Sequence, residues 1–221
     1  MRRYLERQIL GGGLAPGQRI IELDVSRRLR LSRSPVREAL RWLVSDGLVE
    51  VHPRRGGRVS PISPRQVRDT FEVFEALESL ATRLAAAHVG EREVRTFRRL
   101  LAGMGEAVAA GDVDAYFRLN ARFHETIYRA AGNATLHRFL VNLGKQITRF
   151  RFAALATPGR MARSLREHRA LVAALGAGDA RRATRLARAS VIHARRALEA
   201  SLASADGLDR SREEGARGAA R

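Results

Sequence analysis

The spacing of apolar residues from Pro64 to about Ser204 constrains the fold more than any other feature of this chain. Apolar side chains recur there at helical intervals, and each break between helical stretches is short and contains glycine. The breaks bound six expected helices, over residues 64–89, 91–110, 112–131, 133–155, 158–176 and 178–202. Because short connections join neighbouring helices that run in opposite directions, the pattern predicts an antiparallel helical bundle.

Residues 1–63 are organised differently, in shorter elements. Apolar spacing predicts helices over residues 2–10 and 21–31, separated by the glycine-rich stretch GGGLAPGQRI. A third helix begins near Ser32 or Ser34, either of which suits the N-cap, has Pro35 in its first turn and ends at Gly47. Two short strands, LVEV and GRVS, flank the turn HPRRG. Three short helices and a hairpin together predict a winged helix-turn-helix, a DNA-binding fold.

The start of the third helix and the hairpin carry the residues expected to contact DNA. The major groove admits one helix, whose N-terminal residues meet the base edges. A serine hydroxyl and the backbone N–H groups of a helix start suit phosphate oxygens, and an arginine there suits guanine. The expected contacts are Ser32, Arg33, Ser34 and Arg37 on the helix, and Arg54, Arg55, Gly56, Gly57 and Arg58 on the hairpin. The alternative is an ordinary capped helix with solvated arginines. The Ser-x-Ser-Pro cap alone would favour this alternative, but the cap, the basic first turn and the basic hairpin together favour DNA binding.

Composition points to the same class of partner. The 41 basic side chains include a single lysine, Lys145, and the net charge is +18, so a polyanion is the expected partner and nucleic acid the foremost one. The absence of cysteine excludes disulfides and thiolate chemistry. No apolar run approaches the ~20 residues of a membrane span, and the N-terminus lacks the apolar core of a signal peptide. We therefore expect a cytoplasmic protein with no membrane partner.

The first 60 residues resemble the DNA-binding domain of GntR-type bacterial transcription regulators. The matching pieces are Ile9, Gly11, LAPGQRI at 14–20, SRSPVREAL at 32–40, LVSDGLV at 43–49 and RRGGRV at 54–59. The resemblance implies DNA contacts at the four helix residues named above and at one wing glycine, Gly56 or Gly57. Some members add an arginine from the second helix. This chain has Leu23 at that position, so either Arg27 or Arg28 serves the role or no residue of the second helix does.

Residues 66–200 resemble the FCD ligand-binding domain of the FadR branch of that family. The matching pieces are NARFHETIYRAAGN at 120–133, SLREHRALVAALGAGDARRA at 164–183 and the final helix. Asn120 and His124, four residues apart, share one helix face, while His168 and His193 lie on two other helices. Three helices could thus direct imidazoles into one bundle interior, as a metal site requires. From spacing alone, structural histidines in the core or on the surface are the simpler interpretation.

The resemblance implies a divalent metal, zinc or nickel, at Asn120, His124, His168 and Ser190. The family pattern has an aspartate and a third histidine where this chain has Asn120 and Ser190, and His193, three residues on, is the candidate replacement. An amide oxygen and two imidazoles make a weak set of ligands, so the sequence leaves the occupancy of the site open. An effector carboxylate could instead pair with an arginine of QITRFRF, for which the candidates are Arg149 and Arg151.

We therefore expect a mainly α protein in three parts: a winged helix-turn-helix over residues 1–63, an FCD-like effector-binding and dimerisation bundle over 64–205, and a disordered, glycine- and charge-rich tail over 206–221. The expected function is a ligand-responsive, sequence-specific regulator of transcription, a repressor released from a double-stranded operator by a small organic acid. A homodimer would read two half-sites.

Two other functions compete with this expectation. A metal-dependent hydrolase would use the bundle histidines, but it needs a general base, and no carboxylate beside His124 or His168 is spaced for that role. A non-specific nucleic-acid-binding protein would not need a histidine-lined bundle. The chain is therefore not expected to be an enzyme.

Overall fold

The computed structural model describes residues 1–10, 13–52, 56–61 and 63–218. Within these ranges the structure describes the backbone alone at Leu10, His52, Lys145, Gln146, Arg149, Arg151, Ala153, Ser201 and residues 204–218. The N-terminal elements are α1 (Arg2–Leu10), β1 (Arg19–Ile20), α2 (Glu22–Leu29), α3 (Arg33–Ser45), β2 (Val49–His52) and β3 (Gly56–Val59). The C-terminal elements are α4 (Pro64–Ala85), α5 (Glu91–Ala110), α6 (Val113–Ala130), α7 (Ala134–Ala156), α8 (Arg160–Gly176) and α9 (Ala180–Gly218).

The N-terminal elements form the expected winged helix-turn-helix around a small core of their own. Leu5 and Ile9 of α1 pack with Leu40 and Leu43 of α3 and with Val49 of β2, all buried. The turn between α2 and α3 passes through Arg30, whose φ of 53° is left-handed. This turn sets α3 across α2, so that the start of α3 is presented at the surface of the domain.

The wing is a three-stranded antiparallel sheet in the order β1-β3-β2. The two strands of the expected hairpin are present, and they pair Val49 with Val59 and His52 with Gly56. His52 and Gly56, which the sequence analysis assigns to the turn, therefore belong to the strands. The third strand, β1, is an addition: Arg19 and Ile20 pair with Arg58 and Gly57. Two residues are too few to show the apolar-polar alternation from which a strand is predicted, so the sequence analysis missed β1. β1 is a strand only because it pairs with β3.

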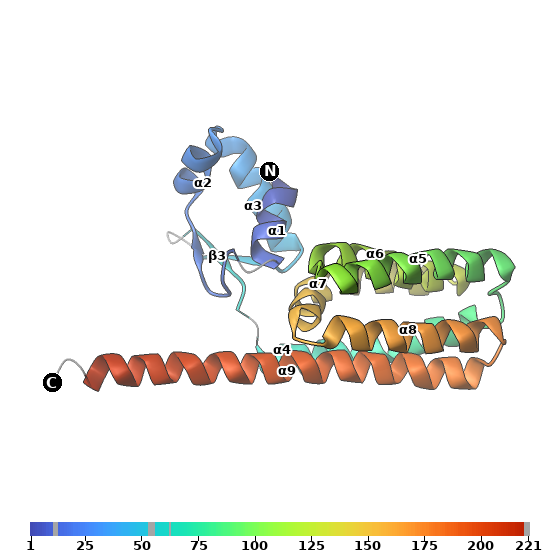
Figure 1. The fold of residues 1–221 in the computed structure, drawn as a ribbon. Helices are drawn as coiled ribbons and strands as arrows, with labels where there is room; N and C mark the ends of the chain where they lie inside the picture. Colours follow the sequence, from blue (N-terminus) through green and yellow to red (C-terminus); the bar gives the residue numbers. More distant parts are fainter. Residues whose placement is uncertain (11–12, 53–55, 62, 219–221) are drawn as a thin grey trace.

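The C-terminal elements form the expected helical bundle (Figure 1), and all the helix boundaries except the end of α9 lie within a few residues of those predicted. Capping explains where several of these helices begin. Ser63 accepts a hydrogen bond from the Gln66 N–H ahead of Pro64, Asp112 caps α6 and Asn133 caps α7. Gly111, with a φ of 65°, ends α5 in a left-handed turn that glycine adopts without a Cβ penalty.

The final helix is longer than expected. Its backbone continues to Gly218, across most of the segment for which the sequence predicts a disordered tail over residues 206–221, and Figure 1 shows it extending past the bundle. Alanine, arginine and glutamate have high helix propensity even where apolar periodicity is missing, which the prediction from glycine and charge underweighted. None of the described helices has the length and apolar character needed to cross a membrane.

Candidate DNA-binding surface and effector cavity

The start of α3 is an accessible polar part of the N-terminal domain. Ser32 is the N-cap residue, with extended backbone, and its hydroxyl makes no capping hydrogen bond to the helix. Ser32, Arg33, Ser34 and Arg37 are all exposed, while Val36 behind them is fully buried. The structure therefore brings the four predicted helix residues together on one solvent-facing surface, with hydroxyl and guanidinium groups directed outward.

Arg37 already has a carboxylate partner. Its Nη2 donates to Glu22 Oε2 at 3.0 Å, and its Nε lies 3.3 Å from both carboxylate oxygens of this first residue of α2. The hydrogen bond to Glu22 raises the pKa of Arg37 above its ordinary value. Since the Arg37 side chain is 59% exposed, DNA can compete with Glu22 for the same guanidinium. Arg27 and Arg28, the alternatives to Leu23 on α2, are also exposed.

The wing residues fall into different positions. Arg54 and Arg55 lie outside the described residues. Gly56 is exposed with a φ of 75°, whereas Gly57 is buried, and a Cβ there would lie 3.4 Å from Val49 Cγ1. Arg58 is at the base of the hairpin, where its Nε donates to the Gly17 carbonyl at 2.6 Å. Of the two wing glycines, Gly56 is therefore the accessible one, and Arg58 is not part of a wing tip.

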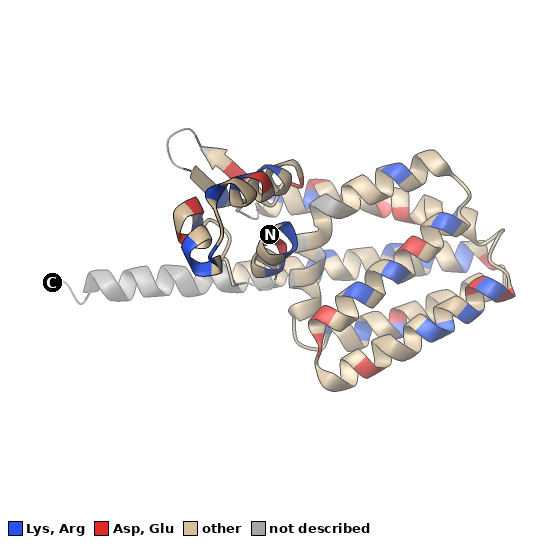
Figure 2. Ribbon diagram, turned by 90° about the horizontal axis from the view of Figure 1, so that it is seen from above, with Lys and Arg blue, Asp and Glu red and all other residues tan. Residues whose placement is uncertain are grey.

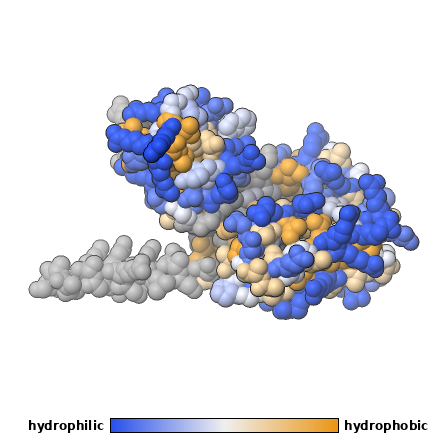
Figure 3. Space-filling model, turned by 45° about the horizontal axis from the view of Figure 1, so that its top comes forward, coloured by the Kyte–Doolittle hydropathy of each residue, from blue (hydrophilic) through white to orange (hydrophobic). Residues whose placement is uncertain are grey.

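Basic residues are not confined to this domain. Figure 2 shows Lys and Arg along the bundle helices as well as on the N-terminal elements, and Figure 3 shows hydrophilic residues over most of the visible face of both. Charge alone therefore does not single out a surface for DNA, and the exposed start of α3 remains the candidate.

Inside the bundle, a cavity of about 40 Å³ brings together most of the residues expected to bind a metal. We call it the inner cavity. Its polar lining comprises Asn120, His124, Arg160, Ser164, His168 and Ser190, and its apolar lining includes Phe71 and Phe74. Asn120, His124 and His168 are 5%, 7% and 2% exposed. Asn120 and His124 lie on one face of α6, as their spacing predicts, and His168 of α8 lines the same cavity.

Hydrogen bonds hold the two imidazoles in fixed orientations. His168 Nε2 lies 2.8 Å from Asn120 Oδ1, and its ring stacks on Phe123 with centroids 4.2 Å apart. His124 Nδ1 lies 2.5 Å from Glu78 Oε1. The second Glu78 oxygen accepts from the Tyr128 hydroxyl, also at 2.5 Å. Glu78 is 1% exposed, and the sequence analysis missed it.

Ser190 is at the fourth position expected to bind the metal, and neither Ser190 nor His193 is arranged there as a metal ligand. Ser190 lines the inner cavity, and its hydroxyl donates to Glu167 Oε2 at 3.0 Å. His193 is turned away: its Nδ1 lies 2.8 Å from Glu167 Oε1, and it lines a separate outer pocket with Arg163, Arg166 and Arg196. An offset of three residues rotates a side chain by about 60° around a helix, which explains why His193 does not replace Ser190.

Arg160 is the second residue that the sequence analysis missed. It is 6% exposed and lines the inner cavity; its Nη1 donates to Glu167 Oε2 at 3.1 Å, and its Nη2 lies 3.4 Å from the Ser190 carbonyl. Nearby, burial raises the pKa of Tyr116 to about 12, so its hydroxyl stays protonated. Arg149 and Arg151, the arginines proposed from sequence to bind the effector, have side chains outside the described residues.

As arranged, these residues do not fit a tightly held divalent metal. A neutral His168 that donates from Nε2 to Asn120 offers no lone pair there, and Asn120 is a neutral ligand. The Arg160 guanidinium on the wall of the inner cavity would repel a cation, although Glu167 offsets its charge. In the part of the chain that is described, no three His, Asp or Glu side chains gather as a metal site. The donors and the guanidinium suit a small anion better.

Both halves of the chain match models of known protein families. Residues 2–59 match the model of bacterial regulatory proteins of the gntR family, and residues 69–193 match the FCD domain. The HTH-type transcriptional repressor RspR of Escherichia coli is 30% identical over 177 residues, covering 80% of this chain and 78% of that protein. A probable D-xylose utilization operon transcriptional repressor of Paenarthrobacter nicotinovorans is 30% identical over 179 residues, covering 81% and 78%.

Among solved structures, E. coli McbR/YncC has the same fold, with a TM-score of 0.75 at 24% identity over 91% of this chain and 96% of that one. The relatives are transcription regulators and not enzymes, so the hydrolase and the non-specific nucleic-acid-binding alternatives have no support. The chain belongs to the GntR family of bacterial transcription regulators, as a member in which a winged helix-turn-helix is joined to an FCD ligand-binding domain.

Proposed function

We propose that this regulator is a repressor that leaves its operator when a small organic acid binds in the inner cavity. The observation that carries the proposal is the combination, in one chain, of an exposed polar start of α3 and a buried polar cavity next to a guanidinium. Two relatives that align with about 80% of this chain are named as repressors, one of them as a probable repressor, which supports this direction of control. A repressor acts where the chromosome lies, in the cytoplasm.

The DNA-bound form is proposed to be a homodimer on a near-palindromic operator. One recognition helix covers only a few base pairs, and a two-fold protein reads two half-sites. Large apolar side chains on the bundle surface, Phe139 at 62% and Val73 at 54% exposure, are available for contact with a second copy. Light scattering at micromolar concentration should therefore give twice the mass of the chain, and a monomer would contradict the proposal.

The proposed effector carries a carboxylate that enters the inner cavity. Arg160 supplies a cationic partner, and Asn120, His168 and Ser190 supply hydrogen-bonding groups around the same space. A volume of about 40 Å³ admits one small polar group, whereas drug-sized ligands occupy roughly 300–1,000 Å³. The ligand is therefore a small acid, or a larger one that places only its carboxylate in this cavity.

A route from this cavity to the DNA-binding domain is available through α4. Glu78 contacts His124 and Tyr128 at the cavity, and α4 runs without a break from Glu78 back to Pro64, next to the wing. An acid that changes the position of His124 changes the interactions of Glu78 in the same step. Differential binding of the acid to two positions of α4 would shift the population of DNA-competent dimers.

The test is an anisotropy titration of the full chain on DNA from its own promoter region, with scrambled competitor and a panel of short-chain acids. An active acid should release wild type from the operator, and His168→Ala should lose the response. His88→Ala is the matched control, because His88 is an exposed histidine outside the cavity. Equal competition by scrambled DNA would refute sequence-specific binding, and an unchanged response in His168→Ala would place the effector elsewhere.

Metal is tested in the same preparation. Elemental analysis of untagged protein purified without chelator should find less than one zinc or nickel per chain, because the donor set is weak. Full occupancy that is lost in His124→Ala would show that the ion belongs to the effector site and that the hydrogen bonds described above rearrange around it.

A further inference from the structure

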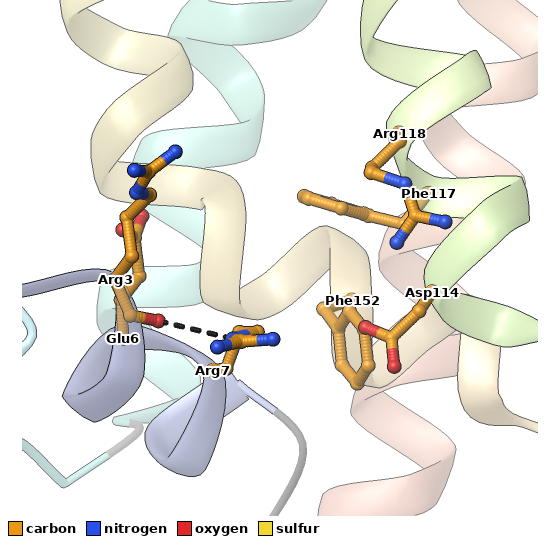
Figure 4. Close-up of a pocket in the computed structure, with 7 residues that line it drawn as sticks. All are labelled: Arg3, Glu6, Arg7, Asp114, Phe117, Arg118 and Phe152. Carbon is orange, nitrogen blue, oxygen red and sulfur yellow. Dashed lines mark hydrogen bonds between the residues drawn. The ribbon is translucent and has the colours of Figure 1, made fainter.

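A second cavity lies between the two domains, and the proposed effector site does not involve it. This interdomain pocket has a volume of about 480 Å³. Arg3, Glu6 and Arg7 of α1 form one wall, and residues of α6 and α7 form the other (Figure 4). Its volume falls in the range of about 300–1,000 Å³ that holds small-molecule ligands.

The bundle side of the interdomain pocket is aromatic. The rings of Phe117 and Phe152 lie edge-to-face with centroids 5.5 Å apart. Phe152 is 8% exposed, so its ring is fixed by the packing of the bundle. An aromatic wall of this kind suits a flat apolar group, because a further ring adds to an existing edge-to-face pair.

The rim of the pocket is cationic and available. Arg3 and Arg7 on α1 and Arg118 on α6 are exposed, and none of the three forms an ion pair with a carboxylate in the described parts of the chain. Arg7 makes one hydrogen bond, from Nε to the Arg3 carbonyl at 3.3 Å, which leaves its two terminal nitrogens for a ligand. Glu6 and Asp114 also line the pocket, so the guanidiniums exceed the carboxylates by one.

The α1 wall is firmly attached to the DNA-binding helix. Arg2 Nη2 pairs with Asp46 Oδ2 at 2.8 Å beyond the end of α3, and Arg2 lies over the Trp42 ring at 5.5 Å. Leu5 of α1 packs into the same core as Leu43 of α3. A ligand that contacts α1 and α6 together would therefore hold α3 in one orientation relative to the bundle.

We propose that the interdomain pocket binds an aromatic carboxylate, with its ring against Phe117 and Phe152 and its carboxylate between Arg7 and Arg118. The ring uses the apolar wall, and the carboxylate uses the guanidiniums that have no carboxylate partner in the described parts. A ligand with only the ring loses the contacts with the guanidiniums, and a ligand with only the carboxylate loses the contact with the aromatic rings, so the complete ligand binds more tightly than its two halves.

Isothermal titration calorimetry on the full chain tests this with benzoate as the probe, and with benzamide and acetate as the two halves. Benzoate should bind saturably, and benzamide and acetate should each bind at least about tenfold more weakly, which corresponds to the loss of one charge-assisted hydrogen bond or of the ring contact. Equal binding of benzoate and benzamide would overturn the role of the arginines.

Variants on both sides of the pocket decide its location. Arg7→Gln and Arg118→Gln should each weaken benzoate binding by about tenfold, since each removes one charged donor. Arg122→Gln, an exposed arginine one turn further along α6 and outside the pocket, should leave it unchanged. His168→Gln should also leave it unchanged. An effect of only one of the first two variants, or loss of binding in His168→Gln, would overturn a site between the domains, and the second result would place benzoate in the inner cavity.

Discussion

Arg37 offers the sharpest test of how the recognition helix meets DNA, because the guanidinium must exchange Glu22 for a base. A bidentate contact of arginine with guanine contributes about 1–3 kcal/mol. An exposed ion pair such as Arg37–Glu22 contributes about 0.2–1 kcal/mol and is lost when DNA binds. The net loss for Arg37→Ala is therefore at most about 2.8 kcal/mol, or up to roughly 100-fold in operator affinity.

The same exchange predicts that Glu22→Gln changes operator affinity in the opposite direction. Removing the carboxylate frees Arg37 in the unbound protein, so operator affinity should rise by about 0.2–1 kcal/mol, the value of the exposed pair. In the Arg37→Ala background this gain should largely disappear, because Glu22 then has no ion pair with Arg37 that competes with DNA binding. The double-mutant cycle isolates the exchange from the general effect of removing a negative charge near DNA.

Fluorescence anisotropy on operator and scrambled duplexes, each over a salt series, measures all four proteins. Arg99→Ala, an exposed arginine on α5, is the control for loss of a positive charge. If Arg37→Ala weakens operator and scrambled DNA equally and lowers the salt slope by about one, Arg37 contacts phosphate and the base assignment is wrong. An additive cycle would refute the exchange with Glu22.

Three further predictions concern the bundle. Glu78→Ala should lower the free energy of unfolding by about 3–5 kcal/mol in a urea titration, because it leaves buried His124 without its carboxylate; a loss below about 1 kcal/mol would contradict that pairing. Burial opposes ionisation of Glu125, but hydrogen bonds from Arg129 and His137 outweigh it and lower its pKa, so the folded state gains stability above the unfolded pKa of about 4.3. Glu125→Gln should therefore be less stable than wild type at pH 7, by no more than about 1 kcal/mol, and the difference should vanish as the pH falls through the lowered pKa; a difference constant with pH would refute this. Arg160→Gln should bind the releasing acid at least about tenfold more weakly by calorimetry while keeping operator affinity, and unchanged acid binding would exclude the guanidinium as its partner.

Helix periodicity predicts most of this fold because each bundle helix has one apolar face and a clear start. Asp112 and Asn133, for example, cap the helices that follow them, and the chain breaks fall beside them. β1 was missed because Arg19 and Ile20 become a strand only by pairing with β3, more than 35 residues away in the chain. Pairing at that distance leaves no local signal.

The site was predictable only where its residues share one helix. Asn120 and His124 are four residues apart, and the structure confirms that they converge. Glu78 was missed although it lies on the apolar stripe of α4, four residues after Phe74 and three before Ala81, which is a signal that the sequence does contain. Arg160 gives no such signal, since it is one of many arginines and its burial depends on Glu167 and Ser190.

The unbroken α4 converts small displacements at the inner cavity into larger ones at its N-terminal end. Fourteen residues separate Glu78 from Pro64, or about 21 Å of helix at 1.5 Å per residue. If the helix pivots near Glu78 by about 5°, its first turn moves by roughly 2 Å. Ser63 caps that turn, so the turn moves together with the rest of α4. In a dimer, where two α4 helices move in this way, the spacing between the recognition helices would change by up to about twice that amount. DNA has a fixed helical repeat and therefore tolerates little variation in that spacing.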